Sequence, residues 1–271
     1  MTQRITETPR PKAENFRSGR KIYLVPTLLA GPGIPDELVQ MLNRYWDEVR
    51  QQVESLERTL SKVTHVYHES VFKPGEEGLR TVESLNPHGH AFVNVLCQST
   101  ATLEPTDLQE AFLEASDWRL CLSMGLASER VARIARDSLD DAMKARYSHM
   151  ATAIDKTLGD DEAGLCILSE DHRVQFPGDI QVFYISPPSL DEIKRWAEEQ
   201  MRRVVSEVSG GGDSGLESSR DQDSDDAGES STGPSEQQSA TAVEAAGEAT
   251  VASEPEAGEG TQGKGHPEYP Y

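Results

Sequence analysis

The chain has 271 residues and a formal net charge of −21, a balance that argues against nucleic acid or anionic lipid as its main partner. From residue 209 onward, fourteen Asp and Glu face two basic residues, and Ile, Phe, Trp, Met and Cys are absent. A segment with so little apolar surface cannot offset the entropy cost of becoming ordered. We therefore predict a flexible basic arm over 1–19, one folded domain over 20–208 and a disordered acidic tail over 209–271.

The first half of the predicted domain alternates strands with helices. The short apolar run KIYLVP, residues 21–26, is typical of a strand, and apolar residues at steps of three and four then predict a helix over 38–63. Pro35 suits the start of this helix. Residues 64–71 are rich in β-branched and aromatic side chains and predict a second strand, which a short helix over 79–85 follows.

Residues 86–127 are the hardest part of the domain to assign. Thr106 and Gln109 have the spacing of a capping box and predict that a helix begins there. The apolar runs on either side are compatible with strands or with buried helical turns, because periodicity cannot decide for runs this short. A long helix is then predicted over 128–158, and Gly159 ends it.

Two strands and a helix complete the domain. The runs AGLCILS (163–169) and IQVFYIS (180–186) are the clearest strand candidates, and Ser189 is the expected N-cap of a final amphipathic helix. Strands that alternate with helices predict an α/β fold. We expect a single layered domain of four to five strands, at least partly parallel, covered by long amphipathic helices.

The polar residues Glu170, Asp171 and His172 separate these two strands and are the best catalytic candidates in the chain. Ligands of α/β sheets bind beyond the carboxyl ends of parallel strands, and a carboxylate beside an imidazole can tune a general base. The alternative is a polar turn between two buried strands, which the following Pro177 and Gly178 favour. We favour the turn, with a solvated His172 whose pKa stays near about 6.5.

The histidines offer a weaker hypothesis, a metal site. His88 and His90 flank Gly89 in an expected loop, and could share a metal ion only if a third ligand came from elsewhere in the fold. His65, His68 and Glu69 also combine imidazole and carboxylate ligands, but on a strand His65 and His68 would point to opposite faces and could not share a metal ion. The sequence identifies no other cofactor.

The cysteines and the hydropathy of the chain indicate the cellular compartment in which the protein is expected. Cys97, Cys121 and Cys166 lie among apolar neighbours without C-x-x-C spacing, as buried thiols of a reducing compartment do. No signal-peptide core follows the basic arm, and no run of about 18 apolar residues is long enough for a bilayer. We expect a soluble, cytoplasmic protein without a membrane partner.

Three functions are compatible with these residues. The first, which we favour, is a non-enzymatic interaction or regulatory protein that binds a protein partner through its charged helix faces or its tail. The second is a hydrolase-type enzyme that uses Glu170, Asp171 and His172, with a metal ion held by His88 and His90 as an optional aid. The third is a nucleic-acid-associated factor, for which only the basic arm argues.

Overall fold

The computed structural model of the chain describes residues 16, 18–28, 30–31 and 33–210, with side chains described as far as residue 206. Within these residues, five strands form one sheet in the order β3-β2-β4-β1-β5, and every neighbouring pair is parallel. The α/β prediction is therefore confirmed, with five strands. The strands are β1 (Lys21–Pro26), β2 (Val63–His68), β3 (Thr102–Glu104), β4 (Ala163–Leu168) and β5 (Gln181–Tyr184). The helices are α1 (Asp36–Thr59), α2 (Gly75–Leu85), α3 (Pro87–Ser99), α4 (Gln109–Ser123), α5 (Glu129–Thr157) and α6 (Pro188–Gly210).

The centre of the sheet is formed by β4, which pairs with β2 on one side and β1 on the other. All six residues of β4 are buried, and so are all six of β1. Helices cover both faces of such a sheet, so a central parallel strand reads as a continuous apolar run. The runs KIYLVP and AGLCIL have this pattern.

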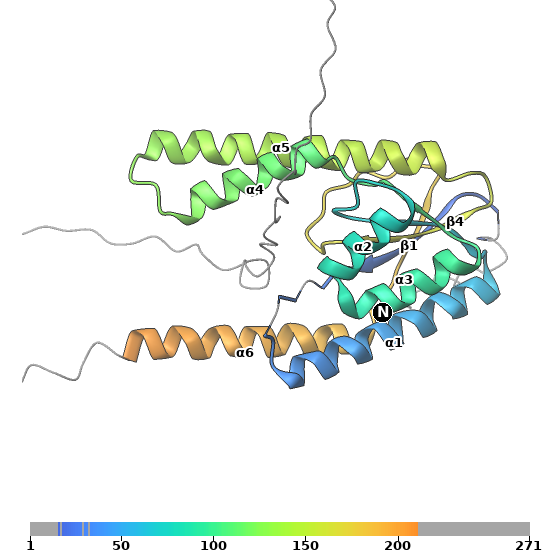
Figure 1. The fold of residues 1–271 in the computed structure, drawn as a ribbon, viewed down its shortest axis with the longest axis horizontal. Coiled ribbons are helices and arrows are strands. Elements are labelled where there is room, and N and C mark those ends of the chain that lie inside the picture. The colour runs from blue at the N-terminus through green and yellow to red at the C-terminus, as the bar shows by residue number, and fades with distance from the viewer. Residues whose placement is uncertain (1–15, 17, 29, 32, 211–271) are drawn as a thin grey trace, which may run out of the picture.

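Helices cover both faces of the sheet (Figure 1), and a hydrophobic cluster lies on each face. On one face the amphipathic stripe of α1, which includes Trp46 and Val49, packs with α2, α3 and the start of α6. On the other face Met150 and Ile154 of α5 pack with the connection between β4 and β5. Helix α4 packs along α5, and the α4–α5 hairpin extends beyond the sheet (Figure 1).

Residues 86–127 contain two helices and one short strand. The apolar runs that the sequence left open lie in α3 and α4, and β3 lies between these helices. The predicted capping box is wrong, because α4 begins at Gln109 without a side-chain cap and the Thr106 hydroxyl donates to the carbonyl of Glu104. Ser189 is not an N-cap either, since it lies inside α6 and its hydroxyl donates to Glu48 Oε2 at 2.7 Å.

The predicted terminal segments fall almost wholly outside the described residues. Of the acidic tail over 209–271, only Ser209 and Gly210 are described, at the end of α6. Of the basic arm over 1–19, only residues 16, 18 and 19 are described. In the described part of the chain, no helix combines the length and the apolar character that crossing a membrane requires.

Candidate functional site at the carboxyl edge of the sheet

The three residues of the predicted catalytic segment follow β4 but do not converge. The Glu170 carboxylate binds the Lys194 ammonium of α6, and Asp171 lies on the opposite side, facing α5. His172 Nδ1 accepts the Val174 N–H at 3.3 Å. Burial lowers the pKa of His172, against the opposing effect of Asp171, so the unshifted pKa expected for a solvated turn is wrong.

The predicted metal ligands His88 and His90 lie in the first turn of α3, not in the expected loop. His88 Nδ1 is 2.9 Å from Asn43 Oδ1 of α1, a contact that fixes its ring between two helices. In the described residues, no group of three or more His, Cys, Asp or Glu side chains is placed to hold a metal ion. His65 stacks on Tyr67 at 6.1 Å, whereas His68 turns to the other face of β2 and approaches Asn86.

The polar residues that do converge lie where β2 and β4 end. These strands are neighbours, but their connections leave toward opposite faces, to α2 in one case and to the α5 side in the other. Such a divergence is the usual place for a ligand in an open α/β sheet. Glu69 follows β2 and Ser169 follows β4, and the Ser169 hydroxyl donates to Glu69 Oε2 at 3.0 Å.

A buried ion pair lies beside Glu69 and joins α5 to the ends of two strands. Arg146 Nε donates to Asp107 Oδ1 at 3.1 Å, and Arg146 Nη2 donates to Asp107 Oδ2. Asp107 also accepts the N–H groups of Ser70 at 3.0 Å and Leu108 at 2.8 Å. These bonds hold Ser70 in the left-handed region, at φ 66°, which a residue with a side chain rarely adopts. The Arg146 guanidinium also stacks over the ring of Phe112, 4.9 Å from its centroid.

Burial shifts the pKa values of two neighbouring side chains, Glu69 and His68, in opposite directions. It raises the pKa of Glu69 to about 7, although the Ser169 hydrogen bonds and the Arg146 charge oppose the shift. It lowers the pKa of His68 to about 4, so this imidazole is neutral at physiological pH. A carboxyl group with a pKa near 7 can both take up and release a proton under these conditions.

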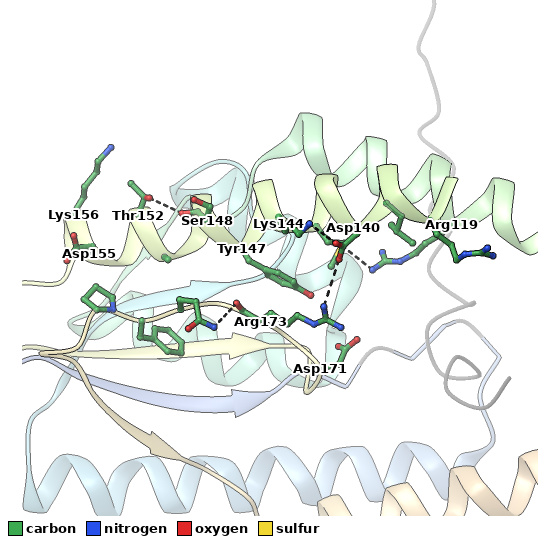
Figure 2. Close-up of a pocket in the computed structure, with 17 residues that line it drawn as sticks. Arg119, Asp140, Lys144, Tyr147, Ser148, Thr152, Asp155, Lys156, Asp171 and Arg173 are labelled. Atoms are coloured by element: carbon green, nitrogen blue, oxygen red, sulfur yellow. Dashed lines mark hydrogen bonds and ion pairs between the residues drawn. The ribbon is translucent and has the colours of Figure 1, made fainter. Parts of the chain in front are cut away.

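A groove of about 950 Å³ opens next to these residues, between α5 and residues 171–177 (Figure 2). Its walls contain apolar side chains, among them Met143 and Phe176. The ionisable side chains in the walls comprise five cations and three carboxylates. The cations are Arg119, Arg136, Lys144, Lys156 and Arg173, and the carboxylates are Asp140, Asp155 and Asp171.

Tyr147 connects the buried residues to the groove. In Figure 2 its ring extends from α5 toward the segment that contains Asp171 and Arg173. Burial raises its pKa to about 12, with smaller effects from Asp171 and from Arg146 and Glu69 behind it. The phenol therefore remains protonated at neutral pH and can donate a hydrogen bond.

Two of the three groove carboxylates already have cationic partners. Asp155 binds Arg20 at 2.8 Å, and Asp140 binds Lys144 at 2.7 Å, with Arg173 at 3.9 Å. Arg20 also binds Asp179, and Lys144 also binds Asp141, so these neighbours outside the groove add no positive charge to the five cations and three carboxylates of its walls. The groove therefore has an excess of positive charge in a chain whose net charge is −21.

Sequence reasoning missed Asp107 and Arg146, and it considered Glu69 only as a possible metal ligand beside His65 and His68. One signal was present, since Arg146 lies on the α4-facing side of the long helix, in line with the buried Ala135 and Ala142. An arginine among buried positions requires a buried anion. The chain matches no protein-family model, no curated protein and no solved structure.

Proposed function

We propose that the protein is a regulatory binding protein that takes a small anionic molecule into the groove between α5 and residues 171–177. The main support is the excess of cations in that groove, in a chain that is otherwise strongly acidic. The groove begins at Asp171, beyond the carboxyl end of β4, and runs along α5 as far as Asp155 and Lys156. Cationic side chains in a concave site attract an anion more strongly than the same charges on a flat surface. The volume of about 950 Å³ is in the range of small-molecule sites.

The walls of the groove indicate which kind of anion would bind. Arg119 and Arg173 line the groove, and arginine is the side chain that binds a carboxylate or a phosphate through two parallel N–H groups. Met143, Phe176 and the ring of Tyr147 provide apolar surface for the rest of the molecule. A compact organic acid or phosphate ester with an apolar or planar part combines both features.

A non-enzymatic role is supported better than the hydrolase built on Glu170, Asp171 and His172, because these side chains point to three different surroundings. One observation favours a second candidate, a hydrolase that uses Glu69. Its raised pKa and its hydrogen bond to Ser169 suit a general acid or base. In that case Glu69→Gln would abolish hydrolysis, and the substrate would have to bind beside Glu69, which is buried and is not one of the groove residues.

The binding proposal predicts a loss of anion affinity on removal of the groove cations. Phosphate, pyrophosphate, citrate and adenosine 5′-monophosphate serve as probes in calorimetric titrations at low ionic strength. We expect at least one of them to bind with a Kd below about 1 mM, and Arg119→Ala with Arg173→Ala to raise that Kd about tenfold or more, the loss of about 1.4 kcal/mol. Added salt should weaken the binding.

The matched control removes the same charge elsewhere. Arg202→Ala with Arg203→Ala changes two exposed arginines of α6, outside the groove, and should leave the Kd unchanged. An equal loss of anion affinity in both double variants would mean that only the net charge of the chain matters. Such a result, or no binding of any of the four probes, would contradict the proposal.

A further inference from the structure

One edge of the sheet stays open in the described part of the chain. Strand β5 is the last strand in the sheet order, and among the described residues it pairs with β1 alone. Gln181 and Ile185 donate their N–H groups toward β1, to the carbonyl oxygens of residues 20 and 24. Because N–H groups alternate in direction along a strand, those of Val182 and Tyr184 point away from β1. Such an edge readily pairs with another segment of chain.

A second groove, which we call the β5 groove, lies between α1 and this edge. Its volume is about 480 Å³, and its walls are formed by Gln52, Ser55 and Leu56 of α1 and by residues 182–185. Among these described residues only Tyr184 has an ionisable side chain. The walls therefore suit a segment of chain that brings backbone hydrogen bonds and uncharged side chains.

Two contacts bring the basic arm to the β5 groove. The ring of Phe16 packs edge-to-face against that of Phe183 in the groove wall, with 5.9 Å between the ring centroids. Gln181 Nε2 donates to the Ser18 carbonyl at 3.0 Å, while Gln181 Oε1 is buried without a hydrogen-bond donor in the described part of the chain. Phe16 is also the first described residue, so residues 1–15 join the described chain beside the groove.

The direction of the arm follows from the same contacts. Phe183 is aligned with Tyr23 of β1, so Phe16 lies beside a residue seven positions further along the chain. The chain therefore reverses direction before β1, at Gly19, whose φ of 86° lies in the left-handed region. Ser18 lies beside the first residue of β5 and Phe16 beside the third. From Ser18 back to Phe16 the chain thus runs toward the carboxyl end of β5.

We propose that residues 8–15 of the basic arm dock in the β5 groove of the same chain and close the edge of the sheet. In an extended segment of this sequence, uncharged and charged side chains fall on opposite faces. The uncharged face has Pro9, Pro11 and Ala13, and the charged face has Arg10, Lys12 and Glu14. The uncharged face fits the groove, while the charged face stays in water. Prolines also favour an extended backbone and pack on aromatic rings such as that of Tyr184.

Length and connection favour the chain's own arm over the arm of a second copy. Eight extended residues span up to about 26 Å, about twice the length of the four-residue strand β5 at about 3.3 Å per residue. Phe16 already anchors the arm to the groove wall, so residues 8–15 are held beside it at a high effective concentration. Docking within the chain also keeps the edge of β5 from pairing with other copies.

Paramagnetic broadening of methyl NMR signals in the full chain tests this docking. A nitroxide spin label is attached through Thr8→Cys, at a position on the charged face of the segment. Cys97→Ser and Cys121→Ser remove the two partly exposed thiols, and Cys166 is buried, so the label reacts at one position.

We expect the label to broaden the methyl signals of Val182 and Leu56 in the groove walls and to leave that of Leu113, exposed on α4, sharp. Phe16→Ala should abolish most of this broadening, because it removes the anchor of the arm. Phe72→Ala is the matched control, since it removes a ring from another edge-to-face pair, with Phe112, and should leave the broadening unchanged. An equal loss of broadening in both variants would contradict the proposal.

A mixed sample separates docking within a chain from docking between chains. It combines spin-labelled chains without isotope and isotope-labelled chains without the spin label, and we expect no broadening of Val182 or Leu56 in it. Broadening in the mixture would assign the groove to the arm of a second copy. The absence of broadening in chains that have both labels would show that the arm does not dock in the groove. Either result would overturn the proposal.

Discussion

Replacing Arg146 with Met is expected to lower the free energy of unfolding by about 3–5 kcal/mol, because the substitution leaves the Asp107 carboxylate buried without its cation. The side chains of both partners are almost completely inaccessible to solvent, at 5% and 0% exposure. Asp107 also accepts two backbone N–H groups, so its protonation would weaken those bonds as well. Urea unfolding followed by circular dichroism measures the loss.

The matched control for this substitution is Arg44→Met, which removes an arginine from the exposed pair of Arg44 with Glu192. Exposed pairs contribute less than about 1 kcal/mol, so this variant should remain close to the wild type. The double variant Arg146→Met with Asp107→Asn should lose less than the sum of the two single losses. Equal losses for Arg146→Met and Arg44→Met would contradict the role given to the buried pair.

Replacing Glu69 with Gln is expected to increase the free energy of unfolding relative to the wild type, and to do so more as the pH rises. The folded chain raises the pKa of Glu69 from 4.5 to about 7, so between these values it binds a proton that the unfolded chain releases. Wild-type stability therefore falls across this window as the pH rises, and the loss is complete above the folded pKa. A shift of this size corresponds to about 3 kcal/mol.

The measurement is a set of urea titrations of both proteins from pH 4.5 to pH 8.5. The difference in the free energy of unfolding between the variant and the wild type should be smallest at pH 4.5 and reach about 3 kcal/mol at pH 8.5. His68 contributes with the opposite sign, since its lowered pKa costs stability as the pH falls from 6.5 to about 4, but this contribution is common to both proteins. A difference that does not change with pH would show that Glu69 is ionised in the folded chain.

Much of the architecture could be predicted from local patterns. The strands β1 and β4 are continuous apolar runs, and α1 and α5 have long apolar stripes at helical spacing. The segment that became α3 was ambiguous in apolar pattern alone. Its start was nevertheless marked by Asn86, whose side chain accepts the Gly89 N–H at 3.0 Å, and by Pro87 in the first turn.

The candidate site could not be predicted in the same way, because its members meet only through strand order. Glu69 and Ser169 are 100 residues apart and become neighbours because β4 inserts between β1 and β2. Asp107 and Arg146 are 39 residues apart, and no local pattern pairs them. The predicted cluster of Glu170, Asp171 and His172 relied on adjacency in sequence, and consecutive residues of this turn point in different directions.

Methyl NMR of the six methionines tests anion binding in the groove most directly. Met143 lines the groove and its sulfur accepts a hydrogen bond from Arg119 at 3.4 Å, whereas Met201 is exposed on α6, outside the groove. Titration with phosphate, pyrophosphate, citrate and adenosine 5′-monophosphate should shift the Met143 methyl signal saturably and leave that of Met201 in place. Arg119→Ala with Arg173→Ala should remove the shift. A Met143 signal that does not move with any of the four anions, or that moves together with Met201, would contradict the assignment of the groove as an anion site.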